Sequence, residues 1–176
     1  MPKTPNEIVD ELLERRTTIM QMIVEMPKGT STKFEIDKNT GRIALDRELA
    51  TTVPANYGFL EGTLASDGDA LDIFLINRDP VPPLTQAKAQ IIGMFRCRDQ
   101  GVQDDKVVAI LPNASETEIV GALLDIRQYL QTYKTGFVVE HFENKDIALT
   151  AIKRARQMYL NDGTTHGETQ AEHADE

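Results

Sequence analysis

The residues whose types and spacing could do chemistry are concentrated in one short segment, Asp67-Gly68-Asp69-Ala70-Leu71-Asp72. Carboxylates this close repel one another, so a fold that gathers them usually places a divalent cation between them. Oxygen ligands favour Mg²⁺, Mn²⁺ or Ca²⁺ over zinc. The segment is not an EF-hand loop, because Leu71 stands where that loop needs an acidic or amide side chain. Asp-Gly dipeptides also form ordinary solvated turns, so this motif alone leaves a cation site and a turn both open.

A second acidic group lies farther along the chain, between two predicted strands. It consists of Asp99, Asp104 and Asp105. A polar hairpin loop would contain such residues without any metal, so by itself this group favours the simpler interpretation of a loop.

Basic and aromatic side chains lie at the ends of several predicted elements. They are Lys33, Arg47, Lys106, Tyr133 and Lys134. Charged groups at such positions are usually solvated, and a lysine near a helix C-terminus interacts favourably with the helix dipole. Lys33 shares one face of a predicted strand with Glu35 and Asp37. Sequence spacing does not show whether these side chains converge on an anion.

The elements that must position these residues are mostly short strands. We predict strands over 18–25, 33–37, 42–47, 72–76, 90–96, 106–111 and 137–142. Residues 38–41 are predicted to form a hairpin loop, and Asn56-Tyr57-Gly58 a turn with a partly buried tyrosine.

Three helices are predicted around these strands. The first covers 6–16, the second begins at the capping box of Ser115 and Glu118, and the last begins near Asn144. Inward-facing residues of the second are Ile119, Leu123, Ile126 and Leu130, and those of the last are Ile147, Ala151, Ala155 and Met158. Strands followed by helices predict an α+β fold built on a small antiparallel barrel.

Length and composition place limits on the protein class. The 176 residues, of which 40% are hydrophobic, suit one domain over 1–162, with 163–176 as a disordered acidic tail. A net charge of −9 argues against general nucleic-acid binding. The sequence contains no apolar run of the length that a membrane span needs and no apolar stretch typical of a signal peptide. A single cysteine, Cys97, is typical of a reducing compartment, so we expect a cytoplasmic location.

Taken together and in order, the motifs resemble the family I (soluble) inorganic pyrophosphatases of prokaryotic type. The resemblance runs from about Glu25 to Met158. Residues 67–72 match the family signature D-[SG]-D-P-[LIVM]-D, with Ala70 in place of proline. The other matching motifs are Val24-Glu25-Met26-Pro27, Lys33-Phe34-Glu35-Ile36-Asp37, Asp46-Arg47, Pro54-Ala55-Asn56-Tyr57-Gly58, Asp99 with Asp104 and Lys106, and Tyr133-Lys134.

The resemblance implies a role for each matched residue. Metal ligands would be Asp67, Asp72 and Asp104, with Asp99 joining Asp104 on a substrate-bound metal and Glu25 and Glu35 acting through metal-bound water. Asp69 would be the general base. Phosphate oxygens would be held by Lys33, Arg47, Tyr133 and Lys134, with Tyr57 and Lys106 close by.

The resemblance also implies an activity, a fold and an assembly. The activity is hydrolysis of pyrophosphate to two phosphates with Mg²⁺, for which Mn²⁺ could substitute. The implied fold is an OB-like five-stranded antiparallel barrel with flanking helices, and the implied assembly is a homo-oligomer, a hexamer being favoured.

Some features depart from the family pattern. Val53 stands where the family often has tyrosine, and the segments from Arg47 to Pro54 and after Lys134 are shorter than expected. These departures leave two alternatives open. One is a phosphohydrolase for nucleoside triphosphates or short polyphosphates, and the other is a metal- or ligand-binding module without activity.

Overall fold

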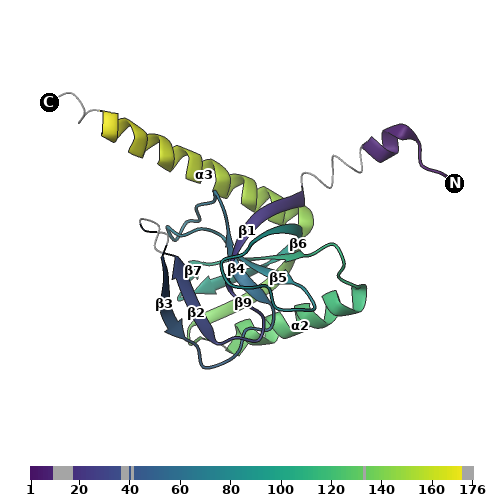
Figure 1. Ribbon diagram of the computed structural model, residues 1–176, viewed down its shortest axis with the longest axis horizontal. Helices are drawn as coiled ribbons and strands as arrows, with labels where there is room; N and C mark the ends of the chain where they lie inside the picture. Colours follow the sequence, from purple (N-terminus) through teal and green to yellow (C-terminus); the bar gives the residue numbers. More distant parts are fainter. Residues whose placement is uncertain (10–17, 37–39, 41, 133, 172–176) are drawn as a thin grey trace.

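The computed structural model describes residues 1–9, 18–36, 40, 42–132 and 134–171. Its strands are β1 (Ile19–Met26), β2 (Thr32–Ile36), β3 (Ile43–Glu48), β4 (Asn56–Leu60), β5 (Asp72–Ile76), β6 (Gln86–Asp99), β7 (Val102–Gln103), β8 (Lys106–Ile110) and β9 (Phe137–Asn144). Two long helices, α2 (Glu116–Thr132) and α3 (Lys145–Ala171), follow in the second half of the chain (Figure 1). The α+β class is therefore confirmed. None of the helices in the described part of the chain combines the length and the apolar character needed to span a bilayer.

The main sheet forms a ring of strand pairings. β1 pairs with β4, β4 with β5, β5 with β8, β8 with β6, and β6 returns to β1. The sequence predicted a wholly antiparallel barrel. The ring departs from this prediction because β5 and β8 are parallel. Between β5 and β8 the chain passes through β6, which is antiparallel to β8. The chain therefore enters β8 at the same end of the sheet at which it entered β5. β9 extends the sheet along β6, and β2 pairs only with β3, in a separate hairpin, among the described strands.

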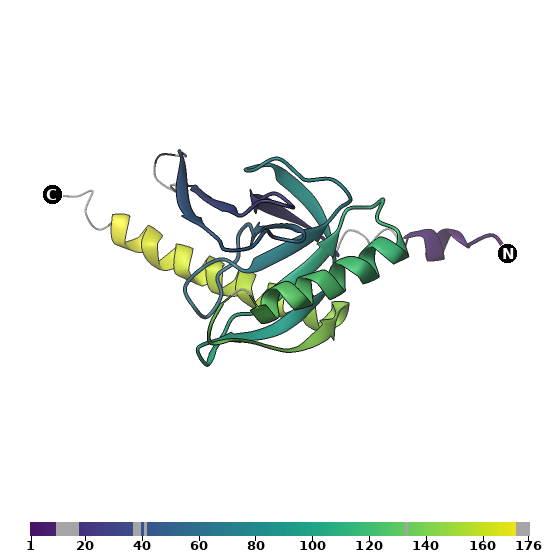
Figure 2. The same cartoon turned by 90° about the horizontal axis from the view of Figure 1, so that it is seen from below.

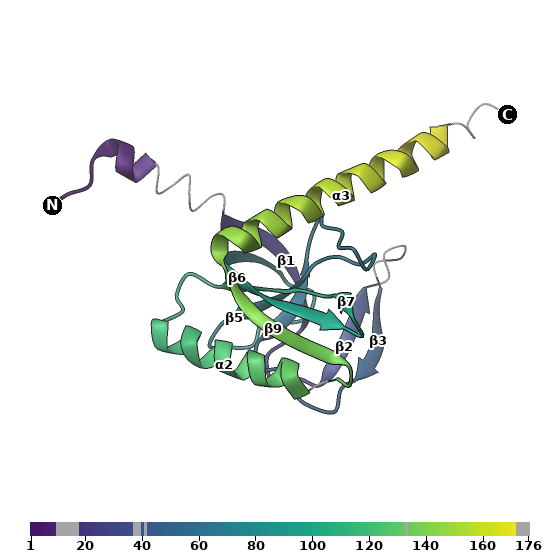
Figure 3. The same ribbon diagram turned by 180° about the vertical axis from the view of Figure 1, so that it is seen from behind.

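The two helices lie over different parts of the sheet (Figures 2 and 3). Side chains alternate along β5, so Ile73 and Leu75 join a core with Ile152 of α3, whereas Phe74 joins one with Ile126 of α2. β5 is thus buried on both faces, which explains its continuous apolar sequence.

The start of α2 follows the predicted capping box. The Glu118 amide donates to Ser115 Oγ at 3.2 Å, and the Ser115 amide donates to Glu118 Oε2 at 3.1 Å. Ile126 and Leu130 are buried, which confirms the inward face of this helix.

The inward face of α3 matches the predicted one in part, because Ala155 is buried and Ile147 and Ala151 pack, partly buried, against the core. Ala148 and Ile152, which were not predicted to face inward, are fully buried, whereas Met158 is 44% exposed. The prediction for Met158 is wrong because Met158 lies beyond Ala155, the last described residue of α3 that belongs to the buried core. α3 continues to Ala171 and so includes residues 163–171 of the predicted tail.

The segment 56–58 is a strand and not the predicted turn. Gly58 lies against β1 so closely that an added Cβ would stand 1.8 Å from the carbonyl oxygen of Ile23. Only glycine permits this approach. The resulting pairing with β1 makes residues 56–58 part of a strand. Tyr57 is partly buried, as predicted.

Some predicted elements lie partly outside the described residues. Residues 5–9 are helical, with Thr4 and Glu7 in a capping box, but 10–16 of the predicted first helix are not described. The same holds for 37–39 and 41 of the predicted hairpin loop, although β2 and β3 pair as expected.

Candidate active site

The centre of the candidate site is the ammonium group of Lys106. Its side chain is only 3% exposed, and it donates to Asp104 Oδ1 at 3.0 Å, to Asp72 Oδ2 and to Tyr57 Oη at 3.4 Å. Strand register explains this grouping, because Asp72 of β5 lies opposite Lys106 of β8 and Tyr57 belongs to the neighbouring β4. Residues far apart in the sequence therefore meet at one end of the parallel strand pair.

Burial perturbs the carboxyl group of Asp104. It raises the pKa of Asp104 above its usual range, and the nearby carboxylates of Asp72 and Asp99 act in the same direction. Lys106 opposes this shift by charge and by its hydrogen bond. The site thus holds partly desolvated negative charge that further positive charge would stabilise.

A cavity of about 440 Å³ opens beside this cluster. Asp67, Asp72 and Asp104 all line it, and residues of α3 such as Ala151 and Arg154 form another wall. Asp67 is placed by its turn, in which the Asp69 amide donates to Asp67 Oδ1 at 3.0 Å. The first acidic motif therefore forms a turn from which Asp67 reaches the cavity, so its two interpretations are compatible.

A smaller cavity of about 30 Å³ lies beside Lys106. It is lined by Lys33, Tyr57 and Lys106 together with apolar residues. Lys33 of β2 is thereby brought close to Tyr57 and Lys106 of the central cluster. Lys106 thus lines the small cavity, and its carboxylate partners Asp72 and Asp104 line the larger one.

A separate ion pair joins Asp99, at the end of β6, to Lys134, which follows α2. The ammonium group of Lys134 donates to Asp99 Oδ2. The other oxygen, Oδ1, is buried and has no hydrogen-bond partner among the described residues. Because a buried carboxylate oxygen normally accepts a hydrogen bond or binds a cation, Asp99 has an unused ligand position.

Other predicted residues are less closely gathered. Glu25 is half-buried in β1, Glu35 is exposed in β2 and Asp69 is exposed in its turn, and none of the three is among the described residues that line the two cavities. The backbone of Arg47 pairs with that of Lys33, but its side chain lies outside what the structure describes, as does the whole of Tyr133.

The fit of these residues to a metal ion has two sides. Within the described ranges, no group of three or more His, Cys, Asp or Glu side chains is arranged to hold a metal ion. The ammonium group of Lys106 lies between Asp72 and Asp104 and keeps these two carboxylates satisfied without one. The donor set is nevertheless all oxygen, with the unused Asp99 Oδ1 nearby, which fits a hard cation such as Mg²⁺.

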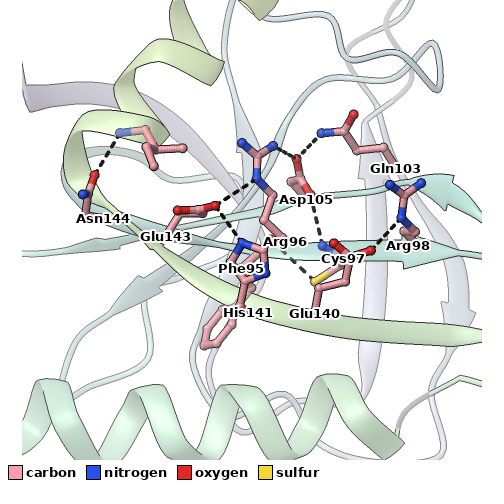
Figure 4. A network of polar contacts seen from close by, with 11 residues as sticks. Phe95, Arg96, Cys97, Arg98, Gln103, Asp105, Glu140, His141, Glu143 and Asn144 are labelled. Atoms are coloured by element: carbon pink, nitrogen blue, oxygen red, sulfur yellow. Dashed lines mark hydrogen bonds and ion pairs between the residues drawn. The ribbon is translucent and has the colours of Figure 1, made fainter.

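Sequence reasoning missed the polar groups that support this site. Arg96, Gln103 and Asp105 also line the larger cavity, and they contact one another (Figure 4). Asp105 was visible as part of the second acidic group, but Arg96 follows the mainly apolar run 91–95 of β6, and its partner Glu143 comes from a distant segment. No local signal in the sequence could have revealed that contact.

Known proteins are similar to this chain in sequence and in architecture. A family model described as inorganic pyrophosphatase matches residues 22–160. Soluble inorganic pyrophosphatase 2 of Chlamydomonas reinhardtii is 34% identical over 153 residues, which cover 78% of this chain and 79% of the algal protein. Soluble inorganic pyrophosphatase 1 of Arabidopsis thaliana is 37% identical over 141 residues, which cover 74% of this chain and 64% of the plant protein.

The fold has solved counterparts as well. The crystal structure of an inorganic pyrophosphatase from Thermus thermophilus superposes with a TM-score of 0.74 at 26% identity, covering 81% of this chain and 92% of that one. A structure of an inorganic pyrophosphatase from Coxiella burnetii gives a TM-score of 0.73 at 27% identity, with coverage of 81% and 96%. This chain therefore belongs to the inorganic pyrophosphatase family.

Proposed function

We propose that this chain hydrolyses inorganic pyrophosphate to two orthophosphates. The observation that carries the proposal is the convergence of Asp67, Asp72 and Asp104 on one cavity beside the buried Lys106, in a chain of this family. In the reaction a water oxygen forms a bond to one phosphorus atom as the bond from that atom to the bridging oxygen breaks. The second phosphate leaves with the bridging oxygen.

The carboxylates of Asp67, Asp72, Asp99 and Asp104 would hold Mg²⁺, or Mn²⁺ in its place, with Glu25 and Glu35 acting at longer range through water. Bound there, the cation supplies positive charge against the substrate polyanion and lowers the pKa of a water molecule. Asp69 is the proposed general base. Its exposed position leaves its carboxylate free to accept a proton from the attacking water.

The positively charged residues would bind the phosphoryl oxygens. Lys106 and Lys33 flank the small cavity, and Lys134 lies beside Asp99, so each can approach a polyanion near the carboxylates. Arg47, Tyr57 and Tyr133 complete the proposed phosphate-binding set. Fixed positive groups stabilise the charge that develops on the phosphoryl oxygens, so positioning and electrostatics suffice for this reaction.

The direct test is orthophosphate release from pyrophosphate, with and without Mg²⁺, beside ATP and tripolyphosphate. Release from pyrophosphate alone that requires Mg²⁺ would support the proposal. Comparable release from ATP or tripolyphosphate would favour the broader phosphohydrolase. Absence of release from all of them, with Mg²⁺ shown to bind, would favour the binding module.

We also propose a cytoplasmic homo-oligomer, with a hexamer favoured, that binds neither nucleic acid nor membranes. The support is the family resemblance, the lone buried Cys97 and the net charge of −9. Sedimentation velocity on the purified chain would measure the assembly, and a monomer at micromolar concentration would contradict this part of the proposal.

A further inference from the structure

The side chain of Asp105 lines the same cavity as the proposed metal ligands Asp72 and Asp104 but has its own set of hydrogen-bond partners. It is buried and accepts three hydrogen bonds. Arg96 Nη1 donates to Oδ2 at 3.0 Å, Gln103 Nε2 donates to Oδ2 at 2.6 Å, and the Cys97 amide donates to Oδ1 at 3.0 Å (Figure 4). Both carboxylate oxygens of Asp105 are therefore occupied by protein donors. Asp105 is thus suited to supporting a neighbouring metal ligand and not to binding a metal ion itself.

One of these bonds replaces part of a strand ladder. β6 pairs with β8 up to Phe95 opposite Lys106, and with β7 from Arg98 opposite Gln103. Between these pairs the Asp104 amide donates to the Cys97 carbonyl at 2.9 Å, but the Cys97 amide donates to the Asp105 side chain. An uninterrupted antiparallel ladder would direct that amide to a main-chain carbonyl. The Asp105 carboxylate thus holds the chain at 104–105 against β6 where the ladder is interrupted.

The same carboxylate is tied to a third strand. Arg96 lies between Asp105 and Glu143 of β9, with 3.7 Å from Arg96 Nε to Glu143 Oε1. Glu143 in turn contacts His141 Nε2 at 2.7 Å, and the next residue, Asn144, accepts from the Ile147 amide at the start of α3 (Figure 4). This network connects the segment that carries Asp104 to β9 and to the helix that forms another wall of the cavity.

The turn between Asp99 and Asp104 depends on such anchors. It contains Gln100 with φ of 50° and Gly101 with φ of 83°, a backbone conformation unfavourable for glutamine. The part of the turn at Gln100 is held by a hydrogen bond, in which the Gln100 amide donates to the Gly136 carbonyl at 2.8 Å. The end of the turn next to Asp104 is held by the hydrogen bond from the Cys97 amide to the Asp105 side chain.

We propose that Asp105 is a positioning residue, which acts through the main chain to hold the Asp104 carboxylate, and with it the turn that follows Asp99, in the geometry that binds Mg²⁺. This inference rests on the proposed function. Residues that support metal ligands in this way typically change metal affinity by about 10–100-fold when they are replaced.

The test uses the full chain with Asp105→Asn and Asp105→Ala. The asparagine keeps an oxygen for the Cys97 amide but turns an amino group toward Arg96 and Gln103, so its effect should be the smaller. Mg²⁺ binding is measured by calorimetry without substrate, and pyrophosphate hydrolysis is measured as a function of Mg²⁺ concentration. We expect the Mg²⁺ dissociation constant to rise about tenfold or more in Asp105→Ala, with hydrolysis recovering at high Mg²⁺.

Glu140→Gln is the matched control. It removes the exposed ion pair of Glu140 with Arg98, 2.6 Å long, which also joins β9 to β6. Its Mg²⁺ affinity should equal that of the unmodified chain. An equal loss of affinity in this control would overturn the proposal, because any β6–β9 contact would then do the same.

Other outcomes also decide. A lower melting temperature with unchanged Mg²⁺ affinity in the Asp105 variants would give Asp105 a purely structural role and overturn the inference. If Asp105→Ala does not fold, Asp105→Asn decides by the same criteria. An unmodified chain that binds Mg²⁺ but does not hydrolyse pyrophosphate would contradict the proposed function alone, because calorimetry still tests Asp105. A chain that does neither would contradict both.

Discussion

Replacement of Lys106 by methionine tests the central cluster most directly. Methionine retains an unbranched side chain, so packing beside the rings of Tyr57 and Phe137 should persist while the charge is lost. In the native chain the ammonium group lies 5.8 Å and 5.7 Å from the centres of these rings. The substitution therefore leaves the carboxylates of Asp72 and Asp104 close together without their shared cation.

The magnitude follows from burial. Removing one partner of a buried ion pair costs about 3–5 kcal/mol, because the other charge stays buried and unpaired. The side chains of Asp72 and Asp104 are 26% and 18% exposed, so water partly screens their charges. The lower end of this energy range therefore applies. We expect the free energy of unfolding to fall by about 3 kcal/mol, which corresponds to roughly 6–12 °C in melting temperature for a chain of this length.

Mg²⁺ should reverse much of this loss. A cation bound to Asp72 and Asp104 competes with Lys106 in the native chain, but not in the variant. The variant should therefore bind Mg²⁺ more tightly, and by linkage a tenfold gain in affinity adds about 1.4 kcal/mol of stability at saturation. Pyrophosphate hydrolysis should remain impaired, about 100-fold, because the positive charge for the substrate is missing.

The assay is thermal unfolding of both proteins across a Mg²⁺ titration, with hydrolysis measured on the same samples. Lys88→Met, at an exposed position of β6, is the control for loss of a positive charge. A variant that Mg²⁺ stabilises less than it stabilises the native chain would refute the reasoning, because Lys106 would then support cation binding and not compete with it.

Three further predictions concern other parts of the chain. Asp69→Asn should abolish most hydrolysis while Mg²⁺ binding persists, and near-normal turnover in a phosphate-release assay would exclude the base role. Burial raises the pKa of the Cys97 thiol to about 12, so at pH 8 only about 10⁻⁴ of it is thiolate. A thiol reagent should consequently label the native chain far more slowly than the unfolded chain and faster as pH rises, and rapid labelling of the native chain at pH 8 would contradict this. Removal of residues 163–176 should leave hydrolysis intact, because the segment carries none of the proposed site residues, and a large loss of activity would assign it a role.

Much of the local structure was predictable because it depends on neighbours in the sequence. The capping box of Ser115 and Glu118 forms as predicted, since both partners lie within one helical turn. The apolar run of β5 likewise predicts a buried strand. The order of the acidic and basic motifs predicted the family, which the comparisons confirm.

The tertiary structure decided how these elements meet. Segment 56–58 reads locally as a turn, but Gly58 allows β4 to lie directly against β1. Along α3, helical periodicity gives the width of the apolar face, but packing on the sheet decided that Ile152 and not Met158 is buried. Such contacts depend on residues far away in the chain, which local propensity does not register.

The same distinction holds for the site. The sequence by itself determined the residue types, the oxygen-rich donor set and the family to which they belong. Only the parallel register of β5 and β8 placed Asp72 beside Lys106 and its near neighbour Asp104, and only the interrupted ladder turned Asp105 toward Arg96. The physical reason is that charge interactions and burial depend on distances of a few ångström, and long-range strand pairing, not spacing along the chain, determines those distances.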